Sequence, residues 1–289
     1  MSRLIVNADD FGLTSGVNRA IVELHQSGVL TSTTLMAKAA ATEEAIDLSR
    51  ANPSLGTGCH IVLVDGEPVL SPRQIPTLVD RETGCFPPKL GTFLMRLFSG
   101  RIRSAEIEAE ASAQIAFLKN RGIRLTHIDT HKHTHMFPNV LRPLLRAARA
   151  AGIGAVRNPF EPEWAVRATP RASFVRTAEV IALRRLGPFF RRLIAREEML
   201  TTDGTVAVVG TGMLDDAAVE ALLRNLPRGT WELVTHPGYN DADLQKVRTR
   251  LHASREIERN ALLSVKNFPE IELISFAGLS SPTAIAGSV

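Results

Sequence analysis

Two adjacent carboxylates near the N-terminus are the first side chains whose types and spacing suggest chemistry. Asp9 and Asp10 follow the apolar run at residues 4–8 and precede Phe11-Gly12. The run is typical of a strand, and in α/β folds ligands and catalytic groups gather at the carboxyl ends of strands. Because neighbouring residues of a strand point to opposite faces, one carboxylate can hold a metal ion while the other reaches its water. A polar turn that caps the next helix is the alternative interpretation.

Histidines lie at or near the ends of later apolar runs. His60 lies in the third run, and His236 directly follows the seventh. The fourth run ends in a group of three polar residues, which are His127, Asp129 and His131. Since the carboxyl ends of barrel strands converge on one rim, we expect these side chains to approach the two aspartates.

This set of side chains contains the parts of a metal-dependent hydrolase. One carboxylate and two imidazoles can hold a divalent cation and leave a position for water, and such donors suit zinc, manganese, cobalt or magnesium. A cation with an open position polarises a carbonyl group and lowers the pKa of bound water. A free carboxylate beside it can act as general base and a histidine opposite as general acid. Hydrolysis of an amide or an ester is the chemistry that these parts fit.

Each of these side chains also has an interpretation without chemistry. His60 alone on a strand could be a core histidine, and His236 before Pro-Gly could be a turn residue. His127 and Asp129 could orient a metal-ligating histidine without binding the metal themselves. A loop is expected to begin near residue 130. A polar run that binds metal adventitiously is therefore the alternative for His131, His133 and His135.

The composition favours a globular protein that does not bind nucleic acid. The chain has 289 residues, of which 44% are hydrophobic, and its net charge of +4 is unevenly distributed. Residues 167–196 contain eight Arg, one Glu and no Lys or Asp, so the rest of the chain is mildly acidic. Aromatic residues make up 5%, too few to suggest platforms for stacking bases, and no RNA-binding or zinc-finger spacing is present.

Cysteine usage and the N-terminal residues predict a cytoplasmic protein. The two cysteines, Cys59 and Cys85, form no CxxC pair and suggest a reducing compartment. The chain runs from Met1 directly into a strand pattern, so no secretory signal is expected, and the apolar runs are too short to span a membrane. Cys59 is expected to pack as a small hydrophobic residue on the face opposite His60.

Strand-like and helical patterns alternate along most of the chain. The expected strands are 4–8, 29–36, 55–64, 123–129, 153–156, 205–209, 231–235 and 272–276, and the expected helices are 17–28, 43–51, 91–99, 104–119, 140–151, 215–225 and 243–263. This order predicts one α/β domain over residues 1–289, a (β/α)-barrel of the TIM type with regular or irregular geometry. An open doubly wound sheet is the structural alternative.

Three segments depart from this alternation, and one of its helices is unusually long. Residues 66–90 are rich in Pro and Gly and predict a long loop. Residues 158–203 predict a basic helical insertion, either a solvated helix pair or a surface that meets lipid headgroups or an amphiphilic substrate at 167–196. The long helix 243–263 is a candidate homodimer interface or a cover for the barrel. The residues from about 280 are expected to form a loose tail.

Four motifs resemble those of the YdjC-like carbohydrate deacetylases. They are Asn7-Ala8-Asp9-Asp10-Phe11-Gly12, Gly58-Cys59-His60, the run from His127 to Pro138, and His236-Pro237-Gly238-Tyr239. They extend over most of the chain. The resemblance implies a (β/α)-barrel and metal-dependent removal of an acetyl group from an N-acetylated amino sugar. The segment that begins at Arg157-Asn158-Pro159 is similar to the hopanoid-biosynthesis-associated branch of this family.

The resemblance also implies a role for each site residue. Asp10, His60 and His131 correspond to the ligands of one divalent metal ion, with Mg²⁺ or Zn²⁺ favoured over Mn²⁺ or Co²⁺. Asp9 corresponds to the catalytic base, and His236 is the candidate general acid. Supporting or substrate-facing roles are expected for His127, Asp129, His133, His135, Arg157 and Tyr239.

The implied substrate is an N-acetylglucosaminyl group linked to a hopanoid lipid, with the basic segment 167–196 in peripheral contact with the membrane surface. Deacetylation of soluble chitooligosaccharides is the first alternative. A metal-holding module without enzymatic activity, which docks on an anionic membrane or a partner, is the second. The paired aspartates argue against this module, because a structural metal site needs no additional base.

Overall fold

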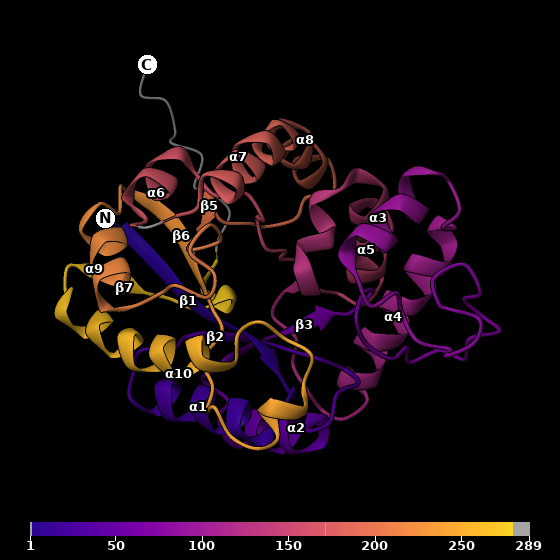
Figure 1. Ribbon diagram of the computed structural model, residues 1–289, viewed down its shortest axis with the longest axis horizontal. Helices are drawn as coiled ribbons and strands as arrows, with labels where there is room; N and C mark the ends of the chain where they lie inside the picture. The colour runs from indigo at the N-terminus through magenta and orange to yellow at the C-terminus, as the bar shows by residue number, and fades with distance from the viewer. Residues whose placement is uncertain (1, 171, 280–289) are drawn as a thin grey trace.

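A computed structural model describes residues 2–170 and 172–279 of the protein. Within these residues seven parallel strands form one sheet in the order β4-β3-β2-β1-β6-β5, and β7 also pairs with β1 (Figure 1). The strands are β1 Ser2–Phe11, β2 Ser32–Leu35, β3 Gly56–Ile61, β4 Ile128–Thr130, β5 Gly204–Val206, β6 Gly229–Thr235 and β7 Ile271–Leu273. The parallel α/β architecture agrees with the prediction.

The two outer strands of the sheet are connected by the extended segment 154–160. Ile128 N of β4 donates to Ala155 O, and Arg157 N donates to Ile128 O, both at 3.1 Å. On its other side the segment accepts a hydrogen bond from Thr205 N of β5 at Phe160 O (3.2 Å). The sheet is therefore an irregular (β/α)-barrel, and the doubly wound alternative is wrong. The predicted strand 153–156 is present only as isolated bridges.

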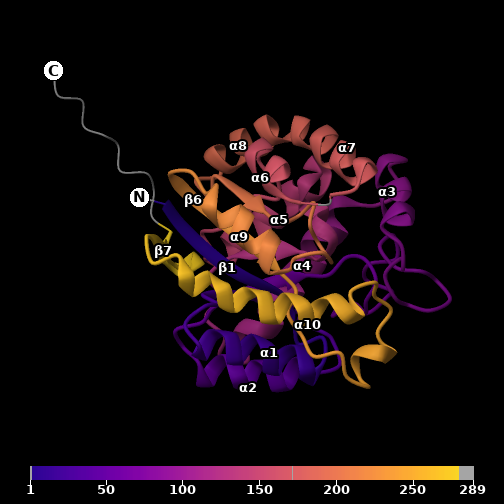
Figure 2. The same cartoon turned by 60° about the vertical axis from the view of Figure 1, so that its left-hand side comes forward.

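Helices cover the outside of the barrel (Figures 1 and 2). The helices between and after the strands are α1 Ser15–Gln26, α2 Thr42–Ala51, α3 Leu90–Phe98, α4 Ser104–Lys119, α5 Pro138–Ala150, α9 Asp216–Arg224 and α10 His252–Ala261. The predicted insertion contains α6 Glu163–Ala168, α7 Phe174–Leu183 and α8 Gly187–Arg196. Short 3-10 turns are η1 His131–Met136, η2 Arg184–Leu186, η3 Leu244–Lys246, η4 Leu262–Asn267 and η5 Phe276–Gly278. No helix in the described ranges has the length and apolar character to cross a bilayer.

The alternation of β1 divides its side chains between two environments. Leu4, Val6 and Ala8 belong to the large apolar core, whereas Ile5 packs separately with Ala155 and Phe276. Asn7 follows Ile5 on the same face by strand periodicity and is fully buried. The barrel interior therefore becomes polar towards the carboxyl ends of the strands.

Two predictions about long connections had different outcomes. The predicted loop 66–90 is confirmed, because residues 62–89 contain no helix or strand. The predicted helix 243–263 is wrong in length, because only His252–Ala261 is α-helical. Before it, Arg248 extends to Asp65 and to the carbonyl of Pro88, and the His252 ring bonds Val247 O. Residues 247–251, where these bonds are made, contain no helix. The predicted tail from about 280 lies outside the described residues.

Candidate metal and catalytic site

The two aspartates at the end of β1 are separated by an irregularity of the strand. The pairing of β1 with β2 shifts register between Ala8 and Phe11, and Asp10 has a left-handed backbone with φ +66°. In a regular strand the two side chains would point to opposite faces. Here both lie near His60, because the bulge turns Asp10 back towards the site. Aspartate is one of the few residues other than glycine that adopts this conformation readily.

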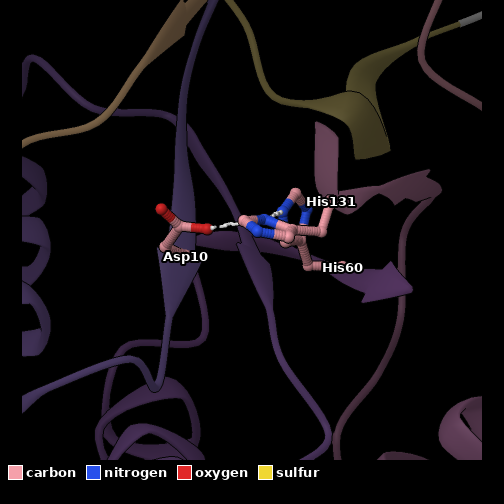
Figure 3. A group of neighbouring side chains, drawn as sticks. All are labelled: Asp10, His60 and His131. Carbon is pink, nitrogen blue, oxygen red and sulfur yellow. Dashed lines mark hydrogen bonds and ion pairs between the residues drawn. The ribbon is translucent and has the colours of Figure 1, made fainter. Parts of the chain in front are cut away.

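Asp10, His60 and His131 meet at the carboxyl ends of β1, β3 and β4 (Figure 3). Asp10 Oδ1 lies 3.5 Å from His60 Nε2 and 3.3 Å from His131 Nδ1. The two ring nitrogens lie 3.3 Å apart. Three side chains from distant parts of the chain thus place one donor atom each in a small triangle.

The triangle fits a divalent cation. Ligand atoms about 2.1 Å from a tetrahedral ion lie about 3.4 Å from one another, which matches the three distances. Asp10 Oδ1 is buried and has no hydrogen-bond partner among the described residues, as expected for an oxygen that a cation would satisfy. His60 Nδ1 bonds Asp129 Oδ1 at 2.8 Å, which orients the ring so that Nε2 faces the triangle.

The charges around His60 set the electrostatics of the triangle. Burial lowers the pKa of His60, but Asp129 and Asp10 outweigh it and raise this pKa to about 10. Burial raises the pKa of Asp10, but Arg255 and the two imidazoles hold it well below its usual range. A cation bound here would therefore replace a proton on His60 while Asp10 remains ionised.

Asp9 belongs to a second, fully buried group around Arg157. The guanidinium donates to Asp9 Oδ2 at 2.8 Å and to Asp9 Oδ1 at 2.6 Å. It also contacts Asp129 Oδ2 and donates to Glu232 Oε1 at 2.8 Å. Asp9, His60 and Asp129 could also form a ligand set, but Arg157 already occupies both carboxylates. This arrangement favours the Asp10 triangle as the metal site.

Arg157 favours the ionised forms of Asp9 and Glu232. Burial raises the pKa of Asp9, but the guanidinium holds it below its usual range, so Asp9 is ionised. Burial raises the pKa of Glu232 to about 7 against the opposing effect of Arg157. Asp9 is thus in the form that can accept a proton, and its orientation is fixed by two parallel hydrogen bonds.

His236 lies beside Asp9 at the end of β6. Its Nε2 is 3.9 Å from Asp9 Oδ2, and its side chain is 13% exposed. Burial lowers the pKa of His236 to about 4, although Asp9 and Asp10 oppose the shift. Its backbone N donates to Glu258 Oε1 at 2.9 Å. His236 is therefore a neutral imidazole near neutral pH with limited access to solvent.

The remaining predicted residues occupy three different environments. His127 stacks on Phe276 at 3.6 Å between ring centroids and lies in the interior of the barrel. His135 Nδ1 bonds Thr130 Oγ1 at 2.7 Å and supports the turn η1. His133 is half-buried in the same turn, and its Nδ1 is buried with no hydrogen-bond partner among the described residues. Tyr239 does not join the site, because its hydroxyl donates to Glu23 and its ring stacks with Arg19 and Arg259.

Sequence reasoning missed several charged or polar residues of the site, among them Glu232, which bonds Arg157. Arg255 and Glu258 of α10 are each 1% exposed, and Arg255 Nη2 donates to Asp10 Oδ2 at 2.5 Å. Thr34 of β2 donates to Asp9 Oδ1 at 3.1 Å. An Arg and a Glu three residues apart are usual on an exposed helix face, so only their burial distinguishes them.

The fold and the site define an α/β-barrel protein with an Asp-His-His group at the carboxyl ends of its strands. The chain belongs to the YdjC-like family, whose model, described as YdjC-like protein, matches residues 3–268. This finding confirms the resemblance seen in the motifs.

Known proteins similar to this chain agree with the family assignment. A carbohydrate deacetylase of Thermoanaerobacter pseudethanolicus is 32% identical over 264 residues, which cover 91% of each chain. A carbohydrate deacetylase of Mus musculus is 32% identical over 249 residues, which cover 82% of this chain and 78% of the relative. A crystal structure of a candidate cellobiose-phosphate cleavage protein from Enterococcus faecalis has a TM-score of 0.73 at 27% identity, over 97% and 99% of the two chains.

Proposed function

We propose that the protein is a metal-dependent carbohydrate deacetylase that removes the acetyl group from an N-acetylated amino sugar. One observation carries this proposal. An ionised carboxylate, Asp9, lies next to a three-donor cation site without being part of it. The names of the relatives support the substrate class.

Asp10, His60 and His131 would hold the cation. When bound, a divalent cation polarises the acetamide carbonyl and lowers the pKa of a bound water. Asp9 takes a proton from the attacking water, and Arg157 keeps the carboxylate ionised and oriented for this step. The carbon–nitrogen bond then breaks, and the oxygen of the water leaves in acetate.

His236 would protonate the departing amine. Because burial keeps it neutral near neutral pH, it can donate a proton only after it has received one. Asp9 Oδ2 is 3.9 Å from His236 Nε2 and holds the proton taken from water, so it is a suitable source. The same proton would thus pass from water to Asp9, to His236 and to the amine.

Release of acetate tests this function. Purified, metal-loaded protein is incubated with N,N′-diacetylchitobiose and, separately, with N-acetylglucosaminyl-hopanoid. We expect acetate from at least one substrate, with loss of activity in Asp9→Asn and His131→Ala and after chelation. His25→Ala is the matched control, because His25 bonds Leu30 O and Ser54 outside the site. Metal binding without acetate from either substrate would contradict the proposal and favour a non-enzymatic module.

We propose further that the natural substrate is linked to a lipid, as in N-acetylglucosaminyl-hopanoid, and that the basic segment 167–196 contacts an anionic membrane surface. α7 has no buried residue, and Phe174, Val175 and Ile181 on it are 87%, 67% and 49% exposed. Exposed apolar side chains beside arginines are typical of surfaces that bind anionic lipid headgroups.

A second helix strengthens the case for membrane contact. Met95 and Phe98 of α3 are 60% and 63% exposed. Figure 2 shows α3 and α7 on the same side of the molecule, away from the N-terminus where β1 begins. β1 runs towards that side in Figure 2, so a membrane in contact with both helices would lie on the side to which the carboxyl end of β1 points.

Binding to lipid vesicles distinguishes the proposal of a lipid-linked substrate from that of soluble chitooligosaccharides. We expect sedimentation with phosphatidylglycerol vesicles and much less with phosphatidylcholine vesicles. The double change Phe174→Ser with Val175→Ser should abolish sedimentation and leave acetate release from diacetylchitobiose unchanged. Leu263→Ser, which alters an exposed apolar residue of η4, is the control. Activity on chitobiose alone with no vesicle binding would favour the soluble substrate.

The cytoplasmic location and the homodimer stay predictions from the sequence.

A further inference from the structure

Arg255 is a buried arginine that approaches the candidate metal site from outside the strands. It lies on α10, 245 residues after Asp10 in the chain, and its side chain is 2% exposed. Its Nη2 donates to Asp10 Oδ2 at 2.5 Å, and its Nη1 donates to His236 O at 3.5 Å. One guanidinium therefore contacts both the expected metal ligand and the segment that carries the expected acid.

The backbone around Arg255 is held as closely as its side chain. Gly238 N donates to Arg255 O at 3.2 Å. A Cβ on Gly238 would lie 3.1 Å from Arg255 Cδ and 3.1 Å from a methyl group of Val17, so a larger residue there would press on the arginine. Glu258, one turn further along α10, accepts from His236 N. α10 thus holds the end of β6 against the end of β1.

The two oxygens of Asp10 have different surroundings because of Arg255. Oδ2 accepts the hydrogen bond from the arginine, whereas Oδ1 faces His60 Nε2 and His131 Nδ1 and has no hydrogen bond among the described residues. The left-handed backbone of Asp10 lies in a bulge, where the regular pleat does not direct its side chain. Arg255 is the contact that determines which oxygen faces the imidazoles.

We propose that Arg255 is a positioning residue that makes Asp10 a ligand through one oxygen only and thereby keeps a coordination position free for water. This inference rests on the proposed metal-dependent function. Without the arginine, Oδ2 is free to turn towards the cation, so Asp10 can bind through both oxygens and fill the position that water needs. Outer-sphere partners of metal ligands commonly change metal affinity or activity by about 10–100-fold.

Cobalt binding tests the proposal without reference to activity. The wild type, Arg255→Gln and Arg255→Lys are titrated with Co²⁺, and both the dissociation constant and the visible d–d absorption are measured. If a carboxylate oxygen takes the place of the water, the d–d spectrum changes and an added anion such as azide loses the position at which it can bind. We therefore expect an altered d–d spectrum that no longer responds to azide in Arg255→Gln, a change in affinity of about tenfold or more, and partial recovery in Arg255→Lys. In acetate release, kcat should fall while KM changes little.

Arg259→Gln is the matched control, because Arg259 lies on the same helix and pairs with Glu23 away from the site. Circular dichroism establishes that each variant is folded. Wild-type absorption and affinity in folded Arg255→Gln would overturn the inference and leave the proposed function intact. Absence of Co²⁺ binding by the wild type would instead overturn the metal-dependent function and, with it, this inference.

Discussion

Each of the two neighbouring aspartates has its own arginine. Asp9 forms two parallel hydrogen bonds with Arg157, and Asp10 accepts one from Arg255. Both carboxylates are almost fully buried, and such carboxylates remain ionised only when cations and hydrogen bonds compensate for lost hydration. The different arrangement of these partners explains how adjacent residues of one type can perform different functions.

Exchanging each aspartate for asparagine should separate these functions. Asp9→Asn should lower kcat by about 10²–10⁴, because the proton acceptor is lost, and should leave metal affinity nearly unchanged. Asp10→Asn should weaken metal binding by more than about 100-fold, the upper end of what loss of an outer-sphere partner costs. Steady-state kinetics and calorimetric titration with the metal measure the two effects. Loss of metal binding in Asp9→Asn would show that Asp9 is itself a ligand.

At the scale of elements, a buried glutamate organises the connection after β5. Glu161 Oε2 accepts from Val209 N at 2.6 Å, in a turn where Ala207 has a left-handed φ of +72°. Glu161 is 1% exposed, and burial raises its pKa from 4.5 to about 7, although hydrogen bonds from the backbone of residues 207–209 oppose the shift. The turn is thus held by a carboxyl group that titrates near neutral pH.

This glutamate should make stability depend on pH. Between 4.5 and about 7 the folded protein retains a proton on Glu161 that the unfolded chain has released, so stability falls as pH rises. The decline from this group amounts to at most about 3 kcal/mol. Glu161→Gln cannot titrate, so it should become more stable relative to wild type as pH rises through this range.

Urea unfolding at several pH values measures this difference. Glu163→Gln is the control, because the Glu163 side chain is 54% exposed and pairs with Arg167 at the surface. A constant difference between Glu161→Gln and wild type at all pH values would mean that Glu161 is ionised in the folded protein.

At the scale of the whole molecule, the segment that closes the barrel also carries the central cation of its interior. Arg157 pairs through its backbone with Ile128 of β4 and through its side chain with Asp9 of β1, Asp129 of β4 and Glu232 of β6. The arginine therefore connects strands on different sides of the barrel. Its removal would leave three buried carboxyl groups without their cation.

Arg157→Gln should destabilise the protein by about 3–5 kcal/mol near neutral pH, the cost of leaving buried charge unpaired. Urea unfolding measures the loss. Arg146→Gln should cost at most about 1 kcal/mol, because the Arg146–Glu108 pair lies at the surface and Arg146 is 50% exposed. Equal stability of the two variants would contradict a structural role for Arg157 in the barrel.

Local sequence patterns were sufficient for the general architecture and for several candidate residues. Runs of apolar residues alternate with helical periodicity, and polar groups placed at the ends of such runs must converge if the strands are parallel. Asp10, His60 and His131 were selected in this way together with the family motifs, and the structure brings them together. The helix Ser104–Lys119 was predicted with its observed bounds, because its apolar spacing and the following Gly122 are local signals.

The tertiary structure decided what depends on contacts between distant residues. The bulge at Asp10, the burial of Arg255 and Glu258, the shortened α10 and the position of Tyr239 outside the site have no local signature. The left-handed φ of Asp10 sets the direction of its side chain. Arg255, 245 residues further along the chain, helps to keep this carboxylate ionised. The sequence by itself determined which chemical groups are present and at which end of the barrel they gather. Only the folded chain determined that both oxygens of Asp9 bond Arg157, whereas Oδ1 of Asp10 has no hydrogen-bond partner among the described residues.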